Sequence, residues 1–262
     1  MLKKLLKYDY GATYKLYLVL YVILLALALI NRILFEIELS DNVVLVSISR
    51  MFLITTVLSC IGLYFATLIF TLFRFYKNLF TDEGYLMFTL PVSPLKLIIS
   101  KIIVGMTWVL SSFLIIAGAI AIMLYNTSTM EDIKDIWNLV GDGVMQLMFN
   151  GQFLQFILYM IKYIIGVFST VCFIYLAVAF GQMIMPRHKI AGSILSYFII
   201  SIASSTISGI ISIFYYAVLR IDLNTSHVPS SYYGLTSFLS LVFAVLSIFL
   251  INNICKKHLN LS

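Results

Sequence analysis

The sequence predicts an all-α membrane protein with six transmembrane helices, and three observations lead to this fold class. The chain has 262 residues, of which 62% are hydrophobic and only 11% are charged, and its mean hydropathy is +1.05. Soluble domains carry about 25% charged residues, so this chain has too few polar side chains to cover a water-exposed surface. Its apolar residues fall in six runs of about 20, the length that a helix needs to cross a bilayer. The runs do not alternate polar and apolar residues, which argues against a transmembrane β-barrel.

The six apolar runs define the expected spans of a single membrane domain over residues 1–262. They cover approximately residues 14–35, 51–73, 97–124, 157–180, 190–219 and 235–254. Each run is expected to be helical because lipid offers no hydrogen-bond partner to the backbone. The first run follows a basic N-terminus, as in a signal peptide, but no small-residue cleavage site follows it, so we expect a retained span. Residues 1–10 suit either a short amphipathic helix on the membrane surface or a basic flank that orients the first span.

The distribution of charge predicts the orientation of these spans. Of the 17 basic residues, 12 lie on the side of the membrane that carries both termini and five on the other, where eight of the 11 acidic residues also lie. By the positive-inside rule, we expect a multi-pass protein of the cell membrane with both termini in the cytoplasm. The net charge of +6 then reflects topology. No basic stripe with interleaved aromatic residues is present, so we expect membrane lipid and no nucleic acid as a partner.

The sequence contains no recognisable set of catalytic residues. The three histidines, His188, His227 and His258, lie in separate loops or tails, and neither HExxH nor GxxxxGK[ST] occurs. The expected spans contain no acidic residue, whereas proton- or sodium-coupled carriers usually bury one. The three cysteines lack metal-site spacing. We therefore expect no catalytic residue, metal or cofactor in this chain, and any energy for transport would come from another subunit.

Three further features each have two interpretations. Lys162, near the start of the fourth span, is either a functional intramembrane charge or a side chain that snorkels to the interface. The outside loop, about residues 125–156, is either a lid over an exit or a packed cap. Four serines share one face of the fifth span, and they either pack within the chain or form a subunit seam or the lining of a translocation path. These serines are Ser201, Ser204, Ser205 and Ser208.

The segment between the second and third spans, about residues 74–96, is expected in the cytoplasm. Its central part, "TDEGYLMFTLPVSP", is too short and too interrupted to cross a bilayer and too apolar for a solvated loop. Thr81 is a suitable N-cap, and Pro91 would end the helix that follows it. Ser93 and Pro94 suit the start of the next helix. We therefore expect a short helix over residues 82–90, whose apolar surface needs a protein partner or lies on the lipid.

The run "FYKNLFTDEGYLMFTLPVSPLKLIISKII", residues 75–103, resembles the cytoplasmic loop between the second and third spans of ABC-2-type transporter permeases, in the form common in Firmicutes. The six-span layout and the missing nucleotide motifs agree with this resemblance. It implies that the 82–90 helix is a coupling helix, which docks on a separate ABC ATP-binding subunit that holds ATP and Mg. The residues that would form this contact are Asp82, Glu83, Tyr85, Leu86, Met87, Phe88 and Leu90.

The resemblance also implies an assembly and a mechanism. Two permeases, as a homodimer or a heterodimer of paralogues, would pair with two ATPases, whose closure on ATP would move the coupling helices and change access to the cavity between the permeases. Because the spans carry no charged binding set, we expect export of a hydrophobic or amphipathic substrate. The alternative function is a membrane scaffold or sensor that recruits a cytosolic partner without transport. A P-loop protein encoded beside the permease, and ATPase activity of the purified complex, would distinguish the two functions.

Overall fold

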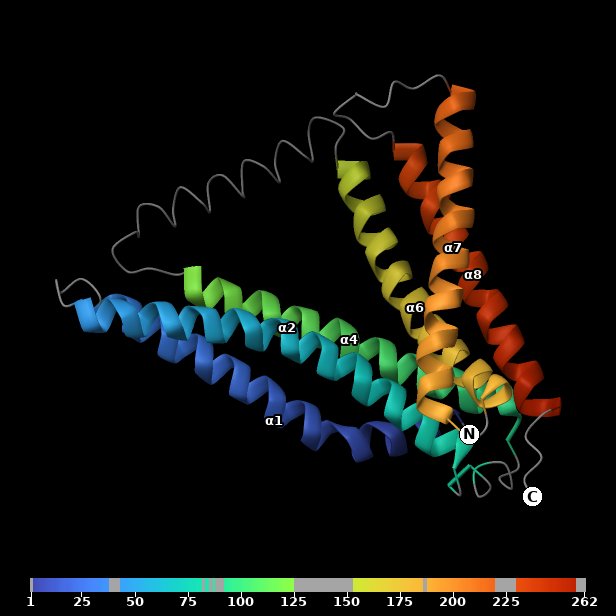
Figure 1. Cartoon of the computed structure of the whole chain (residues 1–262), viewed down its shortest axis with the longest axis horizontal. Helices are drawn as coiled ribbons and strands as arrows, with labels where there is room; N and C mark the ends of the chain where they lie inside the picture. Colours follow the sequence, from blue (N-terminus) through green and yellow to red (C-terminus); the bar gives the residue numbers. More distant parts are fainter. Residues whose placement is uncertain are drawn as a thin grey trace. The chain divides into compact units, whose positions relative to one another are not determined.

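A computed structural model gives the fold of this chain as six long helices (Figure 1). The residues that the structure describes are 2–37, 43–81, 83–84, 87, 92–124, 153–185, 188–219 and 230–257. The helices are α1 (Leu2–Ile37), α2 (Val43–Phe80), α4 (Pro94–Leu124), α6 (Phe153–Ile184), α7 (Lys189–Leu219) and α8 (Ser230–Lys257). Each contains a stretch that is long and apolar enough to cross a membrane. Within the described part of the chain, the structure therefore confirms six helices that could span a membrane, at approximately the predicted positions.

The helices are longer than the apolar runs that predict them. α1 has 36 residues, which at about 1.5 Å per residue extend well beyond a hydrocarbon core of about 30 Å. Residues 2–10 belong to this continuous helix, which favours the interpretation of residues 1–10 as a flank of the first span over a separate surface helix. α6 begins at Phe153, and the last four residues of the expected 125–156 loop are therefore helical. The rest of that loop, with its interpretation as a lid or a cap, lies outside the described residues.

The chain divides into two compact units, which we describe separately. Unit 1 comprises residues 1–2, 72–103 and 150–262, and unit 2 comprises residues 3–71 and 104–149. Unit 1 therefore contains α6, α7 and α8 together with the end of α2 and the start of α4. Unit 2 contains nearly all of α1 together with the remaining parts of α2 and α4.

The helices of unit 2 are held together by a small apolar core and by an aromatic contact whose side chains also form hydrogen bonds. Its core residues are Leu24, Ala28, Leu63 and Ala119. Tyr17 of α1 is buried and stacks on Trp108 of α4, with ring centroids 4.3 Å apart and an interplanar angle of 15°. The Trp108 indole N–H donates to the Thr13 hydroxyl at 3.0 Å, and the Tyr17 hydroxyl lies 3.2 Å from that of Thr71 in α2. The Trp108 indole and the Tyr17 hydroxyl thus each have a polar partner, which offsets the cost of placing them among apolar helices.

Unit 1 is organised around α6, which packs against both α7 and α8 (Figure 1). Its central stretch is almost completely buried, which fits a helix that is apolar on all sides. The buried residues of this stretch are Val171, Cys172, Ile174, Tyr175, Leu176, Ala177, Val178 and Ala179. By contrast, α7 exposes large apolar side chains, with Ile213 72% and Phe214 69% exposed. Such a surface suits contact with lipid.

The backbones of α6 and α7 approach closely at two glycines. A Cβ atom at Gly181 of α6 would lie 2.4 Å from the backbone nitrogen of Ser193, and one at Gly192 would lie 2.7 Å from the Gly181 carbonyl oxygen. Real Cβ atoms do not approach backbone atoms this closely, so both positions require glycine. Ser193 and Ser196 next to this crossing are buried. The first part of the small-residue run of α7 therefore packs within the chain.

Candidate functional site

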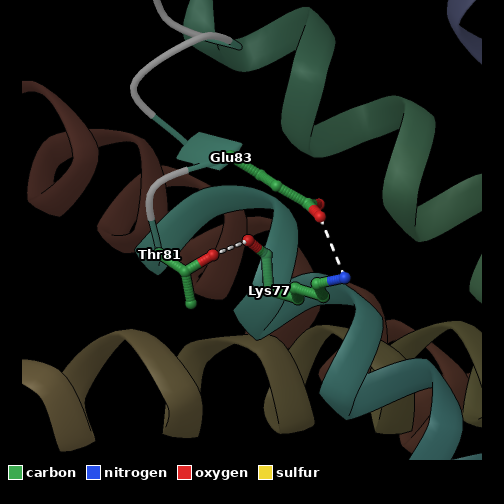
Figure 2. A network of polar contacts seen from close by, with 3 residues as sticks. All are labelled: Lys77, Thr81 and Glu83. Carbon is green, nitrogen blue, oxygen red and sulfur yellow. Dashed lines mark hydrogen bonds and ion pairs between the residues drawn. The ribbon is translucent and has the colours of Figure 1, made fainter.

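The connection after α2 starts with a tight turn that depends on Thr81 and Gly84. The Thr81 hydroxyl donates to the carbonyl oxygen of Lys77 in the last turn of α2 (Figure 2), and the Gly84 N–H donates to the Thr81 carbonyl oxygen at 2.7 Å. The expected role of Thr81 as an N-cap is therefore wrong, because its hydroxyl bonds back to the helix that ends there. A Cβ atom at Gly84 would lie 2.6 Å from the Leu79 carbonyl oxygen. Only glycine fits this turn without displacing the backbone.

Glu83 folds back from this turn toward α2. Its carboxylate forms an ion pair with the Lys77 ammonium at 2.9 Å (Figure 2). The two side chains are 48% and 69% exposed, so the pair alone contributes no more than about 1 kcal/mol to stability. Glu83 is nevertheless held on the same face of the molecule as the end of α2, and this position brings its second oxygen to a buried amide.

That amide belongs to Asn78, which links Glu83 to a buried lysine. The Asn78 amide nitrogen donates to Glu83 Oε2 at 3.0 Å, and its oxygen accepts from Lys101 Nζ of α4 at 2.7 Å. The amide orientation is assigned from these two hydrogen bonds. Asn78 and Lys101 are each only 4% exposed. We refer to Lys77, Asn78, Glu83 and Lys101 as the α2–α4 polar cluster.

The α2–α4 polar cluster is also connected to α6. The backbone carbonyl of Lys101 accepts a hydrogen bond from the Tyr175 hydroxyl at 3.1 Å. The Tyr175 ring stacks on Phe75 of α2, with centroids 3.9 Å apart and an interplanar angle of 5°. Both aromatic side chains are buried. The end of α2, the start of α4 and the middle of α6 are therefore joined by specific contacts around one buried ammonium group.

Two of the seven residues expected to contact an ATPase are described, and they have different surroundings. Glu83 belongs to the α2–α4 polar cluster, whereas Met87 is half-buried. Both have helical backbone conformation, as does Gly84. The other five residues lie outside the described part of the chain, so the 82–90 helix stays a prediction. They are Asp82, Tyr85, Leu86, Phe88 and Leu90.

The helix α4 starts at the residue that the sequence predicts. The helix begins at Pro94, and the N–H groups of Lys96 and Leu97 donate to the Ser93 carbonyl oxygen at 2.9 and 3.4 Å. Proline is favoured in the first turn of a helix because its missing N–H would have no partner there. This prediction is confirmed.

Sequence reasoning missed Asn78 and the burial of Lys101. Lys101 was counted only among the basic residues that set topology, and Asn78 was not singled out. A signal for both was present, because "LIISKII" places one lysine inside an apolar helical stretch. A lysine that becomes buried needs a polar partner, and an asparagine in the preceding helix is a suitable one.

Two of the four serines of α7 donate their hydroxyls within their own helix. The Ser204 hydroxyl donates to the Ser201 carbonyl oxygen at 3.1 Å, and that of Ser205 to the Ile202 carbonyl oxygen at 3.0 Å. The Ser208 carbonyl oxygen accepts from Ser212 at 2.8 Å. Ser201, Ser204 and Ser208 are half-buried and Ser205 is exposed. Their role in a subunit seam or a translocation path stays a prediction.

Lys162 contacts aromatic rings of α8. Its ammonium lies 5.7 Å from the ring centroid of Tyr232 and 5.3 Å from that of Tyr233, and the side chain is half-buried. These distances are typical of cation–π contacts. These tyrosines are about 70 residues from Lys162 along the chain, so the sequence alone does not pair them with it.

Comparisons with protein-family models, with curated proteins and with solved structures found no significant match to this chain. Among the described residues, no group of three His, Cys, Asp or Glu side chains is arranged to hold a metal ion. The candidate function of the chain therefore depends on its six apolar helices and on the α2–α4 polar cluster.

Proposed function

We propose that the chain is the permease subunit of an ATP-driven ABC exporter in the cell membrane, with both termini in the cytoplasm. A separate ATP-binding subunit, which carries ATP and Mg, docks on residues 82–90 and supplies the energy. The permease works with a second permease, as a homodimer or a heterodimer. Its cargo is hydrophobic or amphipathic, because the six apolar runs of the sequence contain no acidic residue and few basic ones.

The observation that carries this proposal is the series of polar contacts that links Glu83 to three membrane helices. The residue is tied to α2 through Lys77 and to α4 through Asn78 and Lys101. The Lys101 carbonyl in turn binds Tyr175 of α6. A partner that moves residues 82–90 would therefore pull on three membrane helices at once.

This connection favours a transporter over the alternative of a scaffold or sensor. A scaffold needs a surface that a partner binds, but it has no need to transmit movement to its membrane helices. An ABC permease needs both, because closure of the ATPases has to change the packing of helices in the membrane. Buried hydrogen bonds to a charged group transmit such a movement well, since breaking one costs more than breaking a solvated contact.

The first test of the proposal is co-purification with a P-loop protein encoded beside the permease. Leu86→Asp and Phe88→Asp each place a carboxylate in the proposed apolar contact, where an unpaired charge is strongly unfavourable. We expect both variants to insert into the membrane at normal levels and to lose at least nine-tenths of the co-purified ATPase. Tyr8→Asp is the matched control, because Tyr8 is a 65% exposed aromatic residue of α1 outside the proposed contact, and it should retain binding.

Two results would contradict the proposal. Retention of the ATPase by both Leu86→Asp and Phe88→Asp would remove residues 82–90 as the docking site. A purified complex that binds its partner but hydrolyses no ATP, even with a panel of amphipathic compounds, would support the scaffold function instead. Stimulation of ATP hydrolysis by one class of these compounds would identify the cargo.

A further inference from the structure

Five tyrosines gather at the end of unit 1 where α7 leads into α8. They are Tyr159 of α6, Tyr215 and Tyr216 of α7, and Tyr232 and Tyr233 of α8. Their rings form a continuous series of contacts, with centroids 5.4 Å apart for Tyr216 and Tyr232 and 6.1 Å apart for Tyr159 and Tyr233. We call these five residues the tyrosine cluster. Three helices contribute to it, so it depends on the tertiary structure of the unit.

Lys162 lies beside two rings of the tyrosine cluster, near one end of three apolar helices. The Lys162 ammonium lies over the rings of Tyr232 and Tyr233. α6 starts at Phe153 and has 32 residues, about 48 Å, so about 9 Å would extend beyond each side of a centred hydrocarbon core of about 30 Å. Lys162 is nine residues, about 14 Å, from that start, and its ammonium can therefore reach the interface. The cluster's tyrosines of α7 lie within the last five residues of that helix, which ends at Leu219, and those of α8 lie within the first four residues, which start at Ser230. Tyrosines are enriched at the membrane–water interface, because the apolar ring can contact lipid while the hydroxyl group is hydrated.

The ammonium has no acidic partner in the helices that surround it. α6, α7 and α8 contain neither aspartate nor glutamate. The only carboxylates among the described side chains are Asp9 in α1 and Glu83 beside α2. The tyrosine rings stabilise the positive charge, but they offer no anionic oxygen to its N–H donors. An anion from outside the described residues would therefore complete the site.

The tyrosine cluster that contacts the ammonium also carries hydroxyl donors. The Tyr232 hydroxyl lies 3.5 Å from that of Ser212, and the Tyr215 hydroxyl contacts that of Ser231. Within the described part of the chain, the hydroxyls of Tyr159, Tyr216 and Tyr233 have no hydrogen-bond partner. A cation together with several hydroxyl donors matches the oxygens of a phosphate group.

We propose that Lys162 and the tyrosine cluster bind the phosphate of an anionic phospholipid headgroup. The depth of the site places it in contact with lipid, and Ile213 and Phe214 next to Tyr215 expose an apolar surface for an acyl chain. A soluble phosphate would use the same Lys162 and tyrosine donors but would leave this apolar surface unused. The proposal is independent of the proposed transport function, because it rests only on α6, α7 and α8.

The test measures lipid binding by the full-length purified chain in neutral, lipid-free detergent. Thermal unfolding is followed during titration with dihexanoyl-phosphatidylglycerol, with dihexanoyl-phosphatidylcholine, and with glycerol phosphate as the soluble headgroup. We expect the anionic lipid to raise Tm in a saturable way and the other two compounds to have much weaker effects. Lys162→Met should weaken the apparent affinity at least tenfold, the equivalent of about 1.4 kcal/mol, whereas Lys162→Arg should stay within about threefold of the parent.

Matched variants separate this site from general surface effects. Lys96→Met removes an exposed lysine at the start of α4, and Tyr197→Phe removes a tyrosine hydroxyl of α7 outside the cluster; both should bind the lipid normally. Tyr216→Phe combined with Tyr233→Phe should weaken binding severalfold, because it removes two donors and keeps the rings. Native mass spectrometry of the same variants gives the number of retained phosphatidylglycerol molecules as a second readout.

Several outcomes would overturn the proposal. Full lipid binding by Lys162→Met would exclude Lys162, and an equal Lys162-dependent shift with glycerol phosphate would identify a soluble phosphate as the ligand. Asp222 is close to the cluster in sequence but lies outside the described residues. If Asp222→Asn and Lys162→Met lower the lipid-free Tm equally and their effects are not additive, the protein itself supplies the anion and the lipid site is wrong.

Discussion

Lys101 is an ionisable side chain with almost complete burial, and its surroundings explain how the protein tolerates this. An isolated ammonium in an apolar environment is very unfavourable unless oxygen atoms replace its hydration. The Asn78 amide oxygen at 2.7 Å supplies one such contact, and the amide nitrogen is in turn satisfied by Glu83. The exposed Lys77–Glu83 pair adds little by itself. The stability of this region should therefore depend much more on Asn78 than on Lys77.

This difference is testable by thermal or chemical unfolding in mild detergent. Asn78→Leu keeps a similar side-chain volume but removes the oxygen that accepts from Lys101, and it should lower the free energy of unfolding by about 1–3 kcal/mol. Lys77→Met breaks only the exposed ion pair and should cost less than about 1 kcal/mol. An Asn78→Leu variant as stable as the parent, or a Lys77→Met variant that is equally destabilised, would contradict this assignment.

At the scale of elements, α6 and α7 show two different uses of small residues in one membrane protein. Gly181 and Gly192 let two backbones touch, and a side chain at either position would collide with backbone atoms. Gly166 of α6 and Gly209 of α7 have open space where a Cβ atom would be. Ser204 and Ser205 of α7 donate their hydroxyls to backbone carbonyl oxygens of their own helix. Helix pairing is therefore concentrated at one end of α7, and the remaining surface is left for lipid or another subunit.

Substitution of three of these glycines by alanine gives a matched prediction for stability. Gly192→Ala should destabilise the protein by about 1–3 kcal/mol, because the added methyl group overlaps the Gly181 carbonyl oxygen and the helices have to separate. Gly166→Ala and Gly209→Ala should be neutral or should stabilise by up to about 1 kcal/mol, because alanine is the better helix former. Thermal unfolding of the three variants in one detergent makes the comparison. Equal losses at all three sites would argue against a specific α6–α7 crossing.

At the scale of the whole molecule, the important property is the orientation of six helices in the membrane. The charge distribution predicts that the α2–α4 connection and both termini face the cytoplasm. The proposed ATPase contact requires this orientation, since ATP is on that side. Topology is thus the property on which the proposed function as a whole depends.

Cysteine labelling in intact cells measures this orientation. The natural cysteines are poorly suited to react, because Cys172 and Cys255 are buried and Cys60 is half-buried within a candidate span. We expect a membrane-impermeant maleimide to label Ser128→Cys in intact cells and to label Lys257→Cys only after permeabilisation. The opposite pattern would put residues 82–90 outside and would exclude a cytoplasmic ATPase as their partner.

The sequence by itself determined the fold class, the six helices, their approximate limits and the start of α4 at Pro94. These features follow from the length of apolar runs and from the chemistry of neighbouring residues, which are local properties. It also led to the resemblance on which the proposed function depends, and it singled out Glu83 and Lys162 without their partners.

Only the tertiary structure decided how these side chains are paired. The contact of Asn78 with Lys101, the backbone crossing at Gly181 and Gly192, and the rings around Lys162 each join residues from different helices. Thr81 was misjudged because its hydroxyl had two possible backbone partners, one in the helix before it and one in the segment after it. Helical periodicity shows which residues share a face of one helix. Which face meets which neighbour is decided by the packing of the whole unit, where burial makes each unpaired polar group costly.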